Sequence, residues 1–350
     1  MNADFFAGFI VSLFNEKTSV TTKQLSLIAA GKRTPSVLFN VEKNNLYTLF
    51  GLFPEVSLKG WERVGQTLLD YRLVKSTEDA LSLTEKGFKA RESFITDFPV
   101  NNGLEQLRYS TTKPLYWNRM IFTTQVFSEY SYKNKQYVPY LSSLEDQRNM
   151  KKWLVEQGRP MDELAQEWFR ELKALFQSLP AKEADFIAGH FSGHHVSGST
   201  SRQLQERYGL SKEHYTVFID QLSYKIVQHD NKRFPLLLSL WNRTHLDCDE
   251  GLSHSARLSR RMLERGKGID EVAVERKLKA NTIREHILEC VLITDWPHFK
   301  QYIRPDHYTA CHTLIGADPA VSYAEAKNEI TDLDFFTFRL IEIERMRRHG

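Results

Sequence analysis

Cysteine is scarce in this sequence of 350 residues, with three residues at Cys248, Cys290 and Cys311 and no Cys-x-x-Cys pair. An odd number of unclustered cysteines argues against a disulfide framework and against a cysteine-rich zinc site. The scarcity is typical of proteins in a reducing compartment. We therefore expect a cytoplasmic protein in which Cys290, inside an apolar run, belongs to the core.

A long apolar run is also absent. The apolar N-terminal segment Phe5–Phe14 is too short to cross a bilayer, and Asp4 stands where a signal peptide carries basic residues. We interpret this segment as a buried first helix and expect no membrane partner.

Sequence motifs for catalysis are missing as well. There is no Gly-x-x-x-x-Gly-Lys-Ser/Thr phosphate loop, no Gly-x-Ser-x-Gly and no His-Glu-x-x-His. His190, His194 and His195 form a small cluster, but the glycines around them indicate a loop, and no carboxylate is near in sequence. We therefore expect no metal, no cofactor, no small-molecule substrate and no enzymatic activity.

Positive charge is concentrated in one segment. The net charge is only +3, whereas residues 255–304 carry eleven Lys/Arg against seven Asp/Glu, a net of +4. The rest of the chain has 36 Lys/Arg and 37 Asp/Glu, a net of −1. A local excess of this kind is the pattern expected of a surface that contacts phosphate.

The periodicity predicts a mainly α, multidomain protein that begins with a winged-helix-like domain over residues 1–95. Apolar spacing predicts further helices over about 22–30, 36–50 and 58–70. Two short extended runs, 71–75 and 80–87, flank the polar turn 76–79 and indicate a hairpin wing. A helical domain with an incidental hairpin is the alternative.

The middle region, residues 96–245, is aromatic-rich and helical. Bases could stack on its rings, although aromatic side chains at helical spacing usually form a core or face a protein partner. Gly209-Leu210-Ser211 separates two amphipathic segments and predicts a second helix-turn-helix. The outer face of its second helix is mixed in charge, which favours a structural or protein-contact role over DNA reading: Lys212, Glu213, His214, Thr216, Asp220 and Gln221. The acidic segment 247–251 then predicts a linker.

The C-terminal region, residues 255–350, contains the most informative motif. Between Gly268 and Glu289, apolar residues are spaced so that two short helices share one small core, with Leu278 filling the turn. The inward positions are Ile269, Val272, Ala273, Ile283, Ile287 and Leu288. This spacing predicts a helix-turn-helix.

The outer face of the second helix and the basic run before the motif supply candidate DNA contacts. Asn and Arg can pair with base edges, and Lys and Thr can reach phosphates. The candidates on the helix are Lys279, Asn281, Thr282, Arg284 and His286, and those in the basic run are Arg257, Arg260, Arg261, Arg265 and Lys267. Glu285 and Glu289 oppose this interpretation unless they face away from DNA. A helical hairpin used for packing is the alternative.

The segment 268–287 resembles the helix-turn-helix at the C-terminus of some RecQ-type helicases and, in outline, that of LuxR-type response regulators. The tail Tyr323–Arg348, with Phe-Phe-Thr-Phe-Arg-Leu-Ile around Arg339, is similar to the end of the same helicase appendage. The layout of the whole chain resembles the YpbB-like family, whose members are encoded beside a RecQ-type helicase. The resemblance implies a nucleoid-associated accessory factor for such a helicase in DNA repair or replication.

Two other functions stay open at this point. A free-standing transcription regulator would also need a helix-turn-helix, and an interaction scaffold would need no DNA contact at all.

Overall fold

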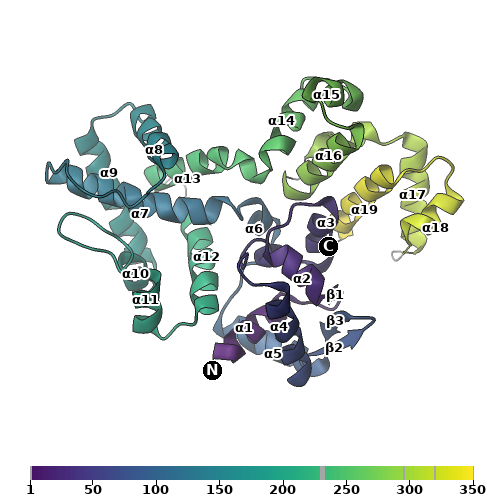
Figure 1. Cartoon of the computed structure of the whole chain (residues 1–350), viewed down its shortest axis with the longest axis horizontal. Helices are drawn as coiled ribbons and strands as arrows, with labels where there is room; N and C mark the ends of the chain where they lie inside the picture. Colours follow the sequence, from purple (N-terminus) through teal and green to yellow (C-terminus); the bar gives the residue numbers. More distant parts are fainter. Residues whose placement is uncertain (1, 229–232, 295, 319–320, 350) are drawn as a thin grey trace. The chain divides into compact units, whose positions relative to one another are not determined.

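The computed structural model of the chain describes residues 2–228, 233–294, 296–318 and 321–349 (Figure 1). Its residues form two compact units, unit 1 with residues 1–9 and 109–248, and unit 2 with residues 10–108 and 249–350. Helices dominate both, and the described residues contain strands only in one small sheet. The predicted mainly α, multidomain fold class is confirmed. The division into domains over residues 1–95, 96–245 and 255–350 stays a prediction.

The N-terminal part of unit 2 combines helices with that sheet. After α1 (Asn2–Leu13), which begins in unit 1, come β1 (Val20–Thr21), α2 (Thr22–Ala29), α3 (Pro35–Asn44), η1 (Tyr47–Leu49), α4 (Leu58–Asp70), β2 (Val74–Thr77), β3 (Ala80–Leu83), α5 (Glu85–Asp97) and α6 (Leu104–Arg108). Thr21, Thr34 and Ser57 cap the starts of α2, α3 and α4 with their hydroxyls. The helix expected over 36–50 ends early, because Asn45 adopts a left-handed conformation with φ 54°.

The sheet is antiparallel in the order β1-β3-β2. Val20 pairs with Leu81, and Val74 pairs with Leu83, so β3 is the central strand. At the turn, Glu78 and Asp79 have φ values of 49° and 66°, the two positive values that a tight hairpin turn of this twist requires. The hairpin predicted around residues 76–79 is confirmed.

The described residues in the C-terminal part of unit 2 form helices and no strand. This part contains η2 (Asp249–Gly251), α14 (His254–Leu263), α15 (Ile269–Arg276), α16 (Ala280–Thr294), η3 (Pro297–Tyr302), α17 (Pro305–Ala317), α18 (Tyr323–Glu329) and α19 (Phe335–His349). Helices α16 and α19 both pack against α3 from the N-terminal part (Figure 1). Unit 2 is therefore built from two segments that are distant in sequence.

Buried ion pairs join these two segments. Arg347 at the end of α19 binds both carboxylate oxygens of Glu42 on α3, at 2.7 and 3.0 Å. The same guanidinium donates to the carbonyls of Val291 and Leu292 on α16, each at 2.9 Å. One side chain thus ties three helices together.

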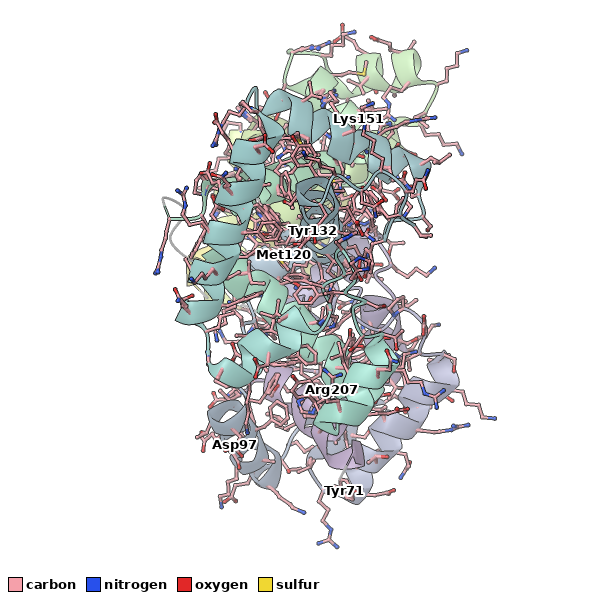
Figure 2. The ribbon with its side chains drawn as sticks, turned by 90° about the vertical axis from the view of Figure 1, so that its left-hand side faces the viewer. Tyr71, Asp97, Met120, Tyr132, Lys151 and Arg207 are labelled. Carbon is pink, nitrogen blue, oxygen red and sulfur yellow. The ribbon has the colours of Figure 1, made fainter. Side chains whose placement is uncertain are left out.

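Unit 1 is a helical unit with an aromatic core. Its helices after α1 are α7 (Thr112–Ser131), α8 (Leu144–Glu156), α9 (Met161–Ser178), α10 (Ala181–Ala188), α11 (Ser201–Tyr208), α12 (Lys212–Gln228) and α13 (Pro235–Asp247). Aromatic residues of α7 in this aromatic-rich region are buried, as expected of a core: Tyr116, Trp117, Phe122 and Phe127. Met120 on the same helix also lies inside the core, whereas Tyr132 directly after it is exposed (Figure 2).

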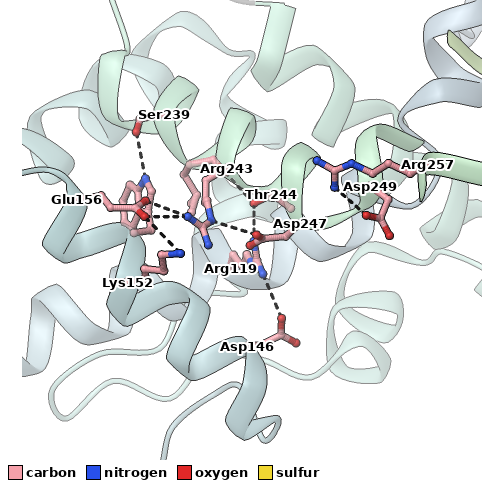
Figure 3. A network of polar contacts seen from close by, with 12 residues as sticks. Arg119, Asp146, Lys152, Glu156, Ser239, Arg243, Thr244, Asp247, Asp249 and Arg257 are labelled. Carbon is pink, nitrogen blue, oxygen red and sulfur yellow. Dashed lines mark hydrogen bonds and ion pairs between the residues drawn. The ribbon is translucent and has the colours of Figure 1, made fainter. Parts of the chain in front are cut away.

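A polar network links three helices of unit 1 (Figure 3). The fully buried Arg119 of α7 donates to Asp247 of α13 at 2.8 Å and to Asp146 of α8 at 3.2 Å. Arg243 pairs with the same Asp247 and with Glu156. Because a buried guanidinium without acceptors would be strongly unfavourable, this network fixes how α7, α8 and α13 pack.

The segment 247–251 is not the loose linker that its composition indicates. The boundary between the two units does fall within it, at Cys248 and Asp249. However, Gly251 is buried, and the guanidinium of Arg33 donates to its carbonyl at 2.7 Å.

No helix among the described residues is both long and apolar enough to cross a membrane.

The close approach of Gly87 to the hairpin gives a test of this packing. A Cβ at Gly87 would lie 2.0 Å from the carbonyl oxygen of Leu73, a rigid backbone atom. We expect Gly87→Ala to lower the free energy of unfolding by about 3 kcal/mol, in the range of overpacking effects. Gly316→Ala is the control, because its Cβ would make only ordinary contacts. Urea unfolding of the two variants measures the difference, and equal stabilities would contradict the packing.

Candidate nucleic-acid interface

Helices α15 and α16 form a helix-turn-helix. The first helix ends where Lys277 takes the left-handed conformation with φ 54°, and the amide of Leu278 then donates to the carbonyl of Ala273 at 2.9 Å. Val272 and Ile283 from the two helices are buried together with Ile287. The motif predicted between residues 268 and 289 is confirmed.

Helix α14 completes a group of three helices. It packs against both α15 and α16. Arg276 at the end of α15 donates to the carbonyl and hydroxyl of Ser255 and to the hydroxyl of Ser259, both on α14. This arrangement fixes the angle at which α16 leaves the turn.

The start of α16 is the exposed part of the motif. Lys279 and Asn281 are exposed, and Thr282 and Arg284 are half-buried. Within the described residues, Lys279 and Arg284 have no ion-pair partner. The N-terminal turns of the second helix are the part of a helix-turn-helix that contacts base edges.

The remainder of α16 is internal. Every residue from His286 to Ile293 is buried, because α3, α6 and α19 cover the helix where α14 and α15 do not. Glu289, which opposed the DNA interpretation in the sequence, faces inward and accepts from the amide and hydroxyl of Ser253 at 2.6 and 2.9 Å. Only the first turns of α16, up to Glu285, are therefore open to a ligand.

The expected position of His286 on the outer face is wrong. Its side chain is buried, and its Nδ1 forms a 2.8 Å hydrogen bond with the hydroxyl of Ser259. Burial, assisted by the nearby charge of Arg276, lowers the pKa of His286 to about 4. The apolar spacing of the helix includes this position, since His286 lies on the same side as Ile283 and Ile287.

Much of the basic run before the motif is neutralised within the protein. Arg257 pairs with Asp249 at 2.7 Å, and Arg260 pairs with Glu264 at 2.8 Å and with Glu250 at 3.4 Å. Lys267 pairs with Glu275. These three cations are less available for phosphate than the sequence suggests.

Two arginines of the basic run and one lysine of the turn remain available to contact phosphate. Arg261 and Arg265 are exposed and form no ion pair among the described residues. Lys277, in the turn, is exposed as well, and sequence reasoning passed over it. Its place in the basic run Arg-Lys-Leu-Lys, between the two helices, is the sequence feature from which a phosphate contact could have been predicted. The candidate interface therefore consists of Arg261, Arg265, Lys277, Lys279, Asn281, Thr282 and Arg284.

The second helix-turn-helix is formed by α11 and α12 in unit 1, and the polar face of α12 is largely half-buried. Asp220 forms a 2.6 Å ion pair with the buried Lys113 of α7. The ring of His214 stacks on Phe5 of α1 with centroids 3.7 Å apart. These contacts give the mixed-charge face a structural role, one of the two roles favoured by its composition.

The histidine cluster lies in a loop, as its glycines indicate, but its partners come from elsewhere in the chain. His190 donates from Nδ1 to the carbonyl of Phe186 at 2.8 Å and contacts the hydroxyl of Tyr215 at 2.8 Å. His194 donates to Glu129 of α7 at 3.0 Å, a carboxylate that the local sequence does not reveal. Among the described residues, no three His, Cys, Asp or Glu side chains are grouped as metal ligands.

The buried His286 predicts a pH-dependent stability. Because its pKa falls from 6.5 in the unfolded chain to about 4 in the folded one, the unfolded state binds the extra proton between these values. Its favourable contribution is complete above pH 6.5 and is lost as the pH falls towards 4. We expect a loss of about 2 kcal/mol at about pH 5, from 1.36 kcal/mol per pKa unit. Urea unfolding at about pH 7.5 and about pH 5 should show a smaller loss for His286→Asn; an equal loss would remove His286 as the cause.

Comparisons with known proteins agree with this geometry. Residues 255–342 match a family described as "Helix-turn-helix domain". The chain is 28% identical over 225 residues to Protein YpbB of Bacillus subtilis (strain 168), an alignment that covers 63% of this chain and 62% of that protein. No solved structure matches. The resemblance to YpbB-like proteins is thereby confirmed, and so is the helix-turn-helix in the C-terminal part of the chain.

Proposed function

We propose that this protein binds duplex DNA through the exposed start of α16. The observation that carries the proposal is the division of this helix, because its first turns present Lys279, Asn281 and Arg284 while its remainder is buried. A helix that enters the major groove by its N-terminal end needs this arrangement. The helix-turn-helix domain family matched by residues 255–342 supports the same conclusion.

The available side chains divide by chemistry. Asn281 and Arg284 have planar groups that can form two hydrogen bonds with one base edge. Arg261, Arg265 and Lys279 supply charges for phosphates, which give affinity and a strong dependence on salt. Glu285 is exposed beside them and limits how far along α16 the contact with DNA extends.

Charge substitutions with matched controls test this proposal. Arg261→Ala with Lys279→Ala should weaken binding of the full chain to duplex DNA and lower the slope of log affinity against log salt by about 2, since each phosphate contact contributes about 0.9. Lys267→Ala with Arg304→Ala is the control, because the half-buried Lys267 and the exposed Arg304 are already paired, with Glu275 and Asp306. Equal slopes in the two double variants would remove this interface.

We propose further that the N-terminal part of unit 2 is a winged-helix domain that faces a protein. The order α1, β1, α2, α3, η1, α4, β2, β3 and the sheet order β1-β3-β2 support the fold assignment, with α3 and η1 inserted before the helix that precedes the hairpin. The tip of the hairpin carries Glu78 and Asp79, both exposed. Two carboxylates at this place repel phosphate, which supports a protein contact instead.

The partner that we propose is a RecQ-type helicase, acting in DNA repair or replication in the bacterial cytoplasm and nucleoid. The resemblance of residues 268–287 and 323–348 to a helicase appendage supports this choice, and the chain has no phosphate loop of its own. The chain would then be a non-enzymatic accessory factor that raises the concentration of a motor at its DNA. An open apolar groove in unit 1, between α9 and α10, supplies a protein-binding surface that includes Phe169, Phe176 and Phe191.

Co-purification with point variants of the full chain tests the partnership, because cutting the chain would divide unit 2. Phe169→Glu should abolish capture of a RecQ-type helicase from the same cell, since it places a charge in the groove. Val155→Glu is the control, being an apolar position that is already 72% exposed on α8. If the parent chain captures no helicase and prefers one duplex sequence at high salt, the transcription-regulator function is favoured instead.

A further inference from the structure

The end of α7 and the loop after it expose several large side chains. Tyr132 is 67% exposed, Tyr140 is 43% exposed and Val138 is 86% exposed. The segment between them contains Lys133 and Lys135, also exposed. Aromatic rings that alternate with lysines on a surface contribute nothing to the core of unit 1, so their exposure calls for another explanation.

The most exposed of these rings belongs to a pile of three. The rings of Tyr132 and His194 are stacked, with centroids 4.4 Å apart and planes at 23°. The exposed ring of His195 lies beside that of His194, with centroids 4.0 Å apart, but the two planes are tilted by 53°. Residues more than sixty positions apart in sequence thus form one surface.

The pile is held in place before any ligand arrives. The buried carboxylate of Glu129 accepts from Nδ1 of His194 at 3.0 Å and from the amide of Asn134 at 2.7 Å, so it fixes both sides of the surface. The hydroxyl of Ser128 accepts from the amide of His194 at 3.0 Å. Gly193 allows this approach, because a Cβ there would lie 2.5 Å from that hydroxyl. A rigid surface loses little entropy when it binds a ligand.

Charge beside the pile favours an anion. Lys133 and Lys135 form no ion pair within the part of the chain that the structure describes. The nearby Glu129 is already satisfied by His194 and Asn134. Tyr130 is less suitable as part of the surface, because its hydroxyl is hydrogen-bonded to the carboxylate of Asp162, which would repel a phosphate. Burial and this carboxylate raise the pKa of the Tyr130 hydroxyl.

We propose that Tyr132, His194 and His195, together with Lys133 and Lys135, form a binding site for single-stranded nucleic acid. Exposed bases stack on aromatic rings, and lysines follow the phosphates, a combination that requires unpaired bases. Bases inside a duplex present only their edges, so this site differs from the helix-turn-helix interface and does not rest on it. Tyr132 and His195 are the exposed rings on which bases can stack, because His194 is half-buried and Tyr132 covers one of its faces.

Fluorescence anisotropy with a single-stranded oligo(dT) and an oligo(rU) of equal length tests the site in the full chain. Tyr132→Ala should weaken binding about tenfold or more, the usual effect of removing one stacking ring, whereas Tyr132→Phe should retain binding. Tyr71→Ala is the control, since Tyr71 is 41% exposed in unit 2 (Figure 2). The tighter of the two oligonucleotides identifies whether DNA or RNA is the ligand.

The lysines give a second readout. Lys133→Gln with Lys135→Gln should lower the salt slope for oligo(dT) by about 1.4, at about 0.7 for each single-strand phosphate. Lys151→Gln with Lys182→Gln, at two other exposed positions of unit 1, should not change it. The proposal is overturned if the parent chain binds neither oligonucleotide, if Tyr132→Ala binds like the parent, or if binding is lost only in Arg261→Ala with Lys279→Ala.

Discussion

The buried carboxylate of Glu289 is the contact around which unit 2 is organised. It lies in the second half of α16 and accepts from the amide and hydroxyl of Ser253, which begins α14, and from Arg33 at 3.3 Å. A carboxylate removed from water is tolerated only when donors surround it. Because Arg33 comes from the N-terminal segment and Ser253 from the C-terminal one, this single charge requires both segments to be in place.

The position of α16 determines what the helix-turn-helix can do. Glu289 and the guanidinium of Arg347 hold its second half inside unit 2, so the helix offers a ligand its first turns alone. Asp249 pairs with Arg257 of α14 and Glu264 pairs with Arg260 of the same helix, so the net positive charge that this helix presents is reduced. Fewer cations remain than the sequence contains, and those that remain lie at the end of α14 and at the start of α16.

A similar use of a buried carboxylate occurs in unit 1. Glu129 at the end of α7 holds a loop from the far side of the middle region, much as Glu289 holds Arg33. In both places the acid is more than nine-tenths buried, and at least one of its partners comes from a segment distant in sequence. Each arrangement leaves a neighbouring set of polar or aromatic side chains on the surface in a fixed geometry. The two surfaces differ in chemistry, one suited to a duplex groove and the other to stacked bases.

The local elements could be predicted from the sequence, because apolar spacing, capping hydroxyls and left-handed glycine or asparagine positions act over a few residues. The hairpin at residues 76–79, the turn at Gly209 and the motif between residues 268 and 289 follow from such signals. Tertiary structure alone decided which charges stay available. His286 is buried against Ser259, Arg257 is neutralised by Asp249, and Glu129 meets His194. These outcomes depend on which side chains the fold brings together, over separations of 8, 27 and 65 positions, and the order of residues does not specify such contacts.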